Sequence, residues 1–190
     1  MKKRIKIGKG ILLIVAFIVL GGYRFINTDT MIPWILAVTS HEIGHLISAK
    51  LLGAGISGMT IDTLGARISL ERTLISYKDE AIIAFGGPAM NFITAAFLFR
   101  VFPNFSAFSL VLGTLNMFPI ISLDGYRILY SLTALKLGDR VAGKISGTAS
   151  FFFLIFLWLI GVYMMLVYHS GISLFLIAFS FIYLSAQNRA

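Results

Sequence analysis

Two histidines and a glutamate form the most reactive group in the sequence: His41, Glu42 and His45 stand in the order His-Glu-x-x-His. On an α-helix, residues four apart lie on one face, one turn from each other, so both imidazoles can bind one metal ion. The glutamate beside the first histidine can take a proton from a water on that metal, whose pKa zinc lowers from about 15.7 to about 7. The pattern therefore predicts metal-assisted hydrolysis.

The surroundings of this motif favour the metal over an ordinary solvated helix face. The motif begins about ten residues into an apolar segment, Met31 to Leu52, which at ~1.5 Å per residue places it some 15 Å along the helix. An ionisable group at such a depth in a membrane costs about 2.5–3.5 kcal/mol, so three of them need a partner or a water-filled cavity. Because the chain has no cysteine, nitrogen and oxygen ligands are expected, and zinc is the natural ion.

A hydrolytic zinc site usually has three protein ligands and one open position, so a third ligand must come from elsewhere in the chain. His169 falls in the short turn expected between the last two spans, where an interfacial histidine is the simpler interpretation. Asp124 follows an apolar, proline-containing segment and precedes Gly125, and both neighbours loosen a helix. Spacing alone leaves Asp124 as either a metal ligand or a helix cap.

The elements that carry these residues are expected to be membrane spans. Of 190 residues, 58% are hydrophobic and 13% charged, and the mean hydropathy is +0.90, which is too apolar for one soluble core. We expect an all-α polytopic membrane protein of about six transmembrane helices, with a small β-hairpin or sheet between the second and third spans, where Ala66 to Glu71 alternates. The expected segments are 11–26, 31–52, 80–102, a short and broken 105–123, 147–168 and 172–186, with 126–137 an interfacial amphipathic helix or a continuation of the fourth span.

The charge distribution orients these spans. The net charge is +8, and with a cytoplasmic amino terminus only Arg24 and Arg100 lie clearly outside, which fits the excess of Lys and Arg on cytoplasmic flanks. We therefore expect a multi-pass protein of the cell membrane with both termini cytoplasmic, and one transmembrane domain over 1–190 without an appended soluble domain. The apolar run from Ile11 to Leu20 lacks a cleavage signature and is interpreted as a retained first span. The basic residues form no aromatic-interleaved patch, so no nucleic-acid partner is expected.

Three motifs together resemble the site-2 protease family of intramembrane zinc metalloproteases. They are the histidine motif, the segment from Asn116 to Gly125 (NMFPIISLDG), and 86–91 (GGPAMN) between them. Their order and membrane placement agree with the family over most of the chain. The chain is most similar to the bacterial branch that processes a sporulation factor, although this branch usually has proline at Ser122 and glycine at Tyr126.

The resemblance implies a role for each candidate site residue. His41, His45 and Asp124 would be the zinc ligands, and Glu42 the catalytic general base and then proton donor. The amides of Asn91 and Asn116 would bind the substrate backbone or the oxyanion; hydrogen bonding between helices is the alternative for both.

The implied activity is hydrolysis of peptide bonds in membrane-spanning or membrane-associated proteins, with zinc as cofactor and the lipid bilayer and a regulatory membrane protein as further partners. The strand-like segment 66–71 would receive an unwound substrate as an added strand. Two other functions were weighed. An inactive helix-binding relative is expected to lack Glu42 or a ligand, and a metal transporter is expected to spread His and acidic residues over several spans.

Overall fold

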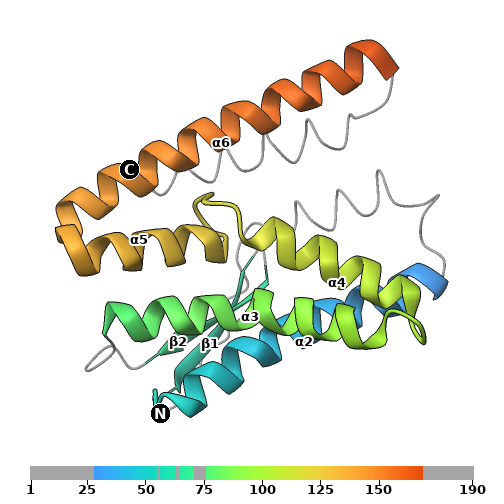
Figure 1. Cartoon of the computed structure of the whole chain (residues 1–190), viewed down its shortest axis with the longest axis horizontal. Helices are drawn as coiled ribbons and strands as arrows, with labels where there is room; N and C mark the ends of the chain where they lie inside the picture. The colour runs from blue at the N-terminus through green and yellow to red at the C-terminus, as the bar shows by residue number, and fades with distance from the viewer. Residues whose placement is uncertain (1–27, 55, 63–64, 71–75, 169–190) are drawn as a thin grey trace.

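The computed structural model describes residues 28–54, 56–62, 65–70 and 76–168 (Figure 1). The elements in chain order are α2 (Thr28–Leu51), β1 (Ile56–Asp62), β2 (Gly65–Leu70), α3 (Tyr77–Leu98), α4 (Pro103–Asn116), α5 (Asp124–Leu137) and α6 (Asp139–Tyr168). Strands β1 and β2 form a two-stranded antiparallel sheet in which Asp62 pairs with Gly65 and Ile56 with Leu70. The expected first span (11–26), the last span (172–186) and His169 lie outside the described residues.

Helix α3 is the centre of the arrangement and contacts α2, α4 and α5, while α6 packs on α5 (Figure 1). Ser76 caps α3 by accepting a hydrogen bond from the backbone N–H of Asp79, and two acidic residues in the first turn favour the helix start electrostatically. Asp139, the first residue of α6, accepts hydrogen bonds from the hydroxyls of Tyr77 and Tyr130 and so joins the starts of α3 and α6 to the middle of α5.

Glycines allow α2 and α3 to cross in direct backbone contact. A Cβ on Gly44 would lie 2.2 Å from the carbonyl oxygen of Gly86, and a Cβ on Gly86 would lie 2.1 Å from Ser48 Oγ. Small residues at a helix crossing let membrane helices approach in this way. Because Gly44 lies inside the histidine motif, the same crossing places that motif against α3.

The segment from Met117 to Leu123 turns the chain from α4 into α5. Ser122 has φ +88°, in the left-handed region, which proline cannot adopt because its ring fixes φ near −65°. Serine in place of the proline that is usual in the resembling branch therefore agrees with the turn seen here. A Cβ on Gly125 would lie 2.2 Å from the carbonyl oxygen of Met117, so this turn also requires a residue without a side chain at position 125.

The expected fold class needs correction. Four of the six expected membrane spans fall within the described residues, which form five helices, and among these only α3 and residues 139–163 of α6 are long and apolar enough to cross a bilayer. The polar motif lowers the mean hydropathy of α2. Helices α4 and α5 have 14 residues each, about 21 Å, against a hydrocarbon core of about 30 Å. Helix α6 also begins at Asp139, eight residues before the expected 147.

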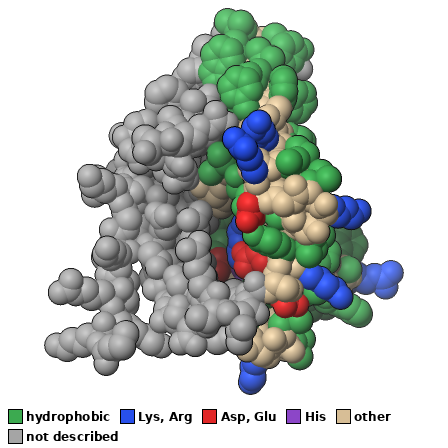
Figure 2. Space-filling model, turned by 90° about the vertical axis from the view of Figure 1, so that its left-hand side faces the viewer, with side chains coloured by type: hydrophobic (Ala, Val, Ile, Leu, Met, Phe, Trp, Pro, Cys, Tyr) green, Lys and Arg blue, Asp and Glu red, His purple; other side chains and the backbone are tan. Residues whose placement is uncertain are grey.

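The outer surface of these helices is apolar along their length and basic at one end. Large apolar side chains such as Phe97 (81% exposed) and Phe152 (63%) face outward, which is typical of helices solvated by lipid. The basic residues at the ends of α2 and α5 and at the starts of α3 and α6 lie at one end of the arrangement: Lys50, Lys78, Lys136, Arg140 and Lys144. Figure 2 shows that end, with Lys and Arg side chains around a few acidic ones.

Candidate metal centre

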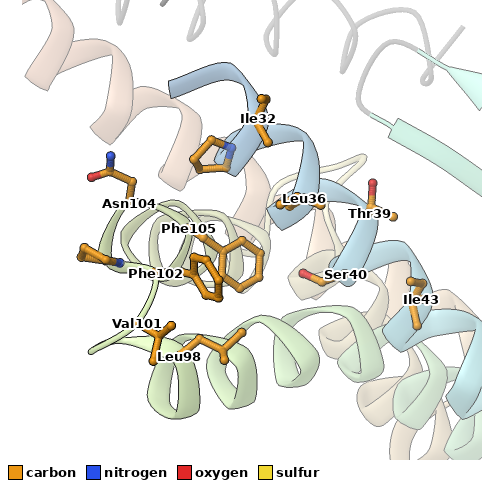
Figure 3. Close-up of a pocket in the computed structure, with 12 residues that line it drawn as sticks. Ile32, Leu36, Thr39, Ser40, Ile43, Leu98, Val101, Phe102, Asn104 and Phe105 are labelled. Carbon is orange, nitrogen blue, oxygen red and sulfur yellow. The ribbon is translucent and has the colours of Figure 1, made fainter. Parts of the chain in front are cut away.

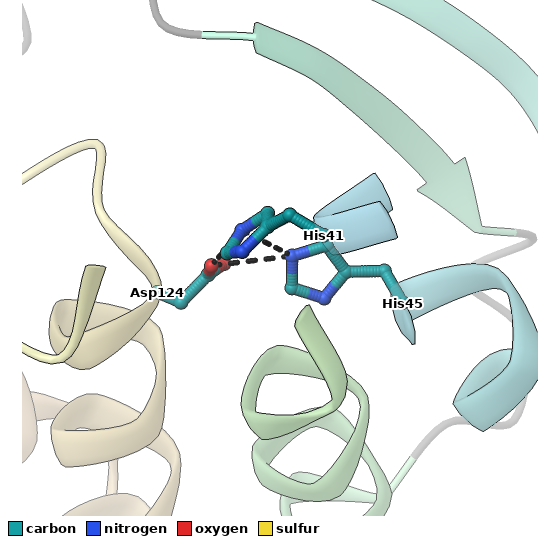
Figure 4. A group of neighbouring side chains, drawn as sticks. All are labelled: His41, His45 and Asp124. Carbon is teal, nitrogen blue, oxygen red and sulfur yellow. Dashed lines mark hydrogen bonds and ion pairs between the residues drawn. The ribbon is translucent and has the colours of Figure 1, made fainter. Parts of the chain in front are cut away.

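Three side chains from two helices converge on one point (Figure 4). His41 and His45 come from α2, and Asp124 is the first residue of α5. Asp124 Oδ2 lies 3.0 Å from His41 Nε2 and 3.1 Å from His45 Nε2, and the two Nε2 atoms are 3.2 Å apart. All three residues are buried, with exposed fractions of 5–7%. The N-cap position of α5 is Leu123, so the Asp124 carboxylate faces the histidines instead of capping the helix.

Gly87 of α3 makes room for both imidazole rings. A Cβ at this position would lie 2.4 Å from His45 Nε2 and 2.8 Å from His41 Cε1. The rings therefore rest directly on the backbone of α3, next to the Gly44–Gly86 crossing. The sequence motif that contains Gly87 gave no hint of this contact, because the contact depends on the crossing of α2 with α3.

The hydrogen bonds of His45 indicate that the three atoms are arranged for a cation. His45 Nδ1 donates to the carbonyl oxygen of Ile83 at 2.8 Å, so Nε2 of the neutral ring carries only a lone pair. That lone pair faces Asp124 Oδ2, also an acceptor, at 3.1 Å. Two acceptors this close repel each other unless a cation lies between them or the imidazole carries a second proton and forms an ion pair with the carboxylate. Ligands about 2.0–2.1 Å from a tetrahedral zinc lie about 3.4 Å from each other, so the observed triangle fits zinc.

His41 is held from its other side by Asn91 of α3. The Asn91 amide nitrogen lies 3.2 Å from His41 Nδ1, and Ser40 Oγ lies 3.1 Å from the Asn91 amide oxygen. Asn91 is fully buried, so the structure places its amide against the histidine rather than open to a substrate. An amide can present either its oxygen or its nitrogen, and it can therefore serve either tautomer of the ring.

Asp124 also has a second partner, which the sequence analysis did not identify. Its Oδ1 accepts a hydrogen bond from Arg127 Nη1 at 3.2 Å, and Arg127 in turn donates from Nε and Nη2 to Glu80 Oε1 of α3, at 3.1 and 2.8 Å. The available signal was the spacing, because an acidic and a basic residue at i and i+3 on a helix are neighbours. No such spacing predicted the contact of Arg127 with Glu80 of α3, because the two residues are 47 positions apart in the sequence.

The other two candidate residues are not among the three that converge. Glu42 is half-buried on α2, next in sequence to His41. Asn116 ends α4 and donates its amide hydrogen to the carbonyl oxygen of Leu112, four residues earlier on its own helix. The structure therefore brings His41, His45, Asp124 and Asn91 together, whereas the described contacts of Asn116 are local.

A largely apolar pocket of about 540 Å³ lies between α2 and the turn from α3 to α4 (Figure 3). Side chains of α2 such as Leu36 and Ile43 line one wall, and Phe102 and Phe105 line the other. Ser40 lines the pocket too and bonds Asn91, which reaches His41. The pocket is thus joined to the metal centre through two hydrogen bonds.

Comparison with known proteins identifies a matching family, a curated relative and a similar solved structure. Residues 29–108 match the family described as Peptidase family M50. The chain is 28% identical over 124 residues to Zinc metalloprotease MJ0392 of Methanocaldococcus jannaschii, a match that covers 58% of this chain and 36% of that protein. The fold is similar to that of a solved Site-2 Protease from Methanocaldococcus jannaschii, with a TM-score of 0.70, 22% sequence identity, and coverage of 99% of this chain and 93% of that one. The chain spans about a third of the length of the curated relative.

Proposed function

We propose that this chain, of which residues 29–108 match peptidase family M50, is a member of that family and a zinc-dependent metalloendopeptidase of the membrane. Its substrates are membrane-spanning or membrane-associated proteins, which it cuts in or beside the bilayer. The observation that carries the proposal is the buried triangle of His41, His45 and Asp124, whose three candidate ligand atoms lie 3.0–3.2 Å from one another.

Each residue of the site has a defined task in this reaction. His41, His45 and Asp124 hold zinc, which when bound polarises the scissile carbonyl and lowers the pKa of a water molecule. Glu42 takes the proton of that water and then gives it to the leaving amine, which completes the hydrolysis. The hydrogen bond from His45 Nδ1 to Ile83 fixes the ring so that Nε2 faces the metal position.

A substrate helix hides its carbonyl groups in internal hydrogen bonds, so it must unwind before it can be cut. The described sheet has two strands, and the outer edge of either strand offers backbone groups to an extended segment. The apolar pocket beside α2 suits the apolar side chains of such a segment. In this scheme Asn116 binds the substrate backbone, whereas the buried Asn91 acts through His41.

The proposal also includes a topology. Residues 1–190 act as one transmembrane metalloprotease domain that crosses the cell membrane several times, with both termini on the cytoplasmic side. The gathering of basic residues at one end of the helices supports this orientation, because cytoplasmic flanks collect Lys and Arg. A regulatory membrane partner and a place in the sporulation-processing branch stay predictions.

Comparison of the wild type with Glu42→Gln tests this function. Both proteins are purified in detergent, assayed for bound zinc, and reconstituted with membrane proteins of the host cell. New amino termini are then identified by mass spectrometry. The substitution keeps the size of the side chain and leaves the three ligands in place. We expect one zinc per chain in both proteins and new termini with the wild type alone.

Other outcomes contradict the proposal in distinguishable ways. Equal cleavage by both proteins would mean that Glu42 is not the base. Zinc bound by both without cleavage by either would favour a helix-binding or transport function. Absence of zinc from both would mean that the triangle is not a metal centre.

A further inference from the structure

The carboxylate of Asp124 is shared between two different sets of partners. One oxygen, Oδ2, lies within 3.1 Å of both histidine Nε2 atoms, and the other, Oδ1, accepts a hydrogen bond from Arg127 Nη1 at 3.2 Å. A carboxylate can rotate and can bind a metal through one oxygen or two. With Oδ1 occupied by the guanidinium, Oδ2 is the oxygen left to face the metal position.

Arg127 is itself held in place by Glu80. Its Nε and Nη2 atoms both donate to Glu80 Oε1, so the planar guanidinium is fixed on the α3 side before it reaches Asp124 on α5. Glu80 lies in the first turn of α3, the helix whose Gly87 supports the imidazoles. The chain Glu80–Arg127–Asp124 therefore ties the acidic ligand to the helix on which the histidines rest.

The burial of Asp124 distinguishes its contact with Arg127 from an ordinary surface ion pair. The Asp124 side chain is 9% exposed, while Arg127 and Glu80 are each 32% exposed. An exposed ion pair contributes little to stability. A hydrogen bond to a buried ligand, however, sets the direction in which that ligand points, and the loss of such a partner typically costs 10–100-fold in metal affinity.

We propose that Arg127, held by Glu80, is a positioning residue that aims Asp124 Oδ2 at the metal. This inference rests on the proposed function, because it requires the triangle to bind zinc. It assigns a task to two residues that touch neither metal nor substrate in the reaction described above. Arginine is required there, since a lysine ammonium cannot bond two sites on Glu80 and Asp124 from one fixed plane.

Zinc affinity in the absence of substrate provides the test. Purified wild type, Arg127→Gln, Arg127→Lys and Glu80→Gln are stripped of metal and titrated with zinc against a chelator. Cobalt(II) absorption spectra then report the ligand geometry, and melting temperatures are measured without metal. Arg140→Gln is the matched control, because Arg140 is an exposed arginine at the same end of the molecule.

We expect 10–100-fold weaker zinc binding and an altered cobalt spectrum for Arg127→Gln, a smaller loss for the other two variants, and no change for Arg140→Gln. Glu80→Gln keeps the side-chain volume on a half-exposed residue, so it reports on the chain of contacts even if Arg127→Gln does not fold. Wild-type zinc affinity and spectrum in folded Arg127→Gln or Glu80→Gln, with only a lower melting temperature, would mean that the ion pair merely joins α3 to α5. Failure of the wild type to bind zinc would refute the proposed metal centre instead.

Discussion

Adding one methyl group at Gly87 should remove the metal centre while leaving every ligand in the sequence. The new Cβ of Gly87→Ala would lie 2.4 Å from His45 Nε2 and 2.6 Å from His45 Cε1. Ordinary van der Waals contact begins near 3.4 Å, so the His45 ring must move by about 1 Å, or α3 must move away from α2. Metal–ligand distances tolerate about 0.2 Å.

The shift therefore exceeds the tolerance about fivefold, and we expect zinc affinity to fall at least 100-fold, beyond the usual effect of an outer partner. The overpacked crossing should also cost about 1–3 kcal/mol of stability. Zinc per chain and chelator competition measure the first effect, and the melting temperature of the metal-free protein measures the second. Cleavage activity should be lost with the metal.

Gly143→Ala is the control for this experiment. A Cβ on Gly143 of α6 would meet nothing within 4 Å, so alanine should bind zinc normally and stabilise the helix by about 0.5–1 kcal/mol. If Gly87→Ala bound zinc as tightly as the wild type and cut substrate normally, the imidazoles would not lie against α3, and the geometry on which the site is built would be refuted.

Three further predictions concern the surroundings of the triangle. Asn91→Leu should weaken zinc binding 10–100-fold, whereas Asn91→Asp, whose carboxylate can accept a hydrogen bond from a protonated His41 Nδ1, should retain most of it. Equal affinities in a chelator competition would contradict this role. Ser122→Gly should raise the melting temperature, because glycine relieves about 1 kcal/mol of strain from the left-handed backbone at this position. Ser122→Pro should weaken zinc binding, because proline cannot adopt this φ and the turn before Asp124 must change. Removal of zinc by a chelator should lower the melting temperatures of the wild type and of Glu42→Gln equally. The free energy of unfolding lost in each is about 2.7 kcal/mol when zinc was present at 100 times its Kd. A smaller shift in Glu42→Gln would make Glu42 a ligand.

The chemistry of the site was readable from the sequence because its spacing is local. The positions of His41 and His45 on one helix face follow from the geometry of an α-helix, and their depth in an apolar segment follows from hydropathy. The resemblance to a family then selected Asp124, where spacing alone left a cap and a ligand open. The structure places Oδ2 of this aspartate within 3.1 Å of both rings, while its role as a zinc ligand stays a prediction.

Hydropathy was a poorer guide to the helices themselves. Four of the predicted spans fall within the described residues, where five helices form and two are long and apolar enough to cross a bilayer. Hydropathy measures the average solvent of a segment. It does not give the length of a helix such as α4 or α5, which ends after 14 residues, or register that a polar motif lies inside α2.

Only the tertiary structure decided which residues support the ligands. Gly87, Asn91 and Arg127 act on His41, His45 and Asp124 from α3 and α5, and their partners lie up to 50 residues away in sequence. These contacts exist because Gly44 and Gly86 let two helices touch, and because a left-handed turn at Ser122 directs α5 back toward α3. The local sequence pattern thus determined which residue types can bind the metal. The crossing of the helices determined where those side chains point, because their orientation depends on contacts with residues that are distant in the sequence.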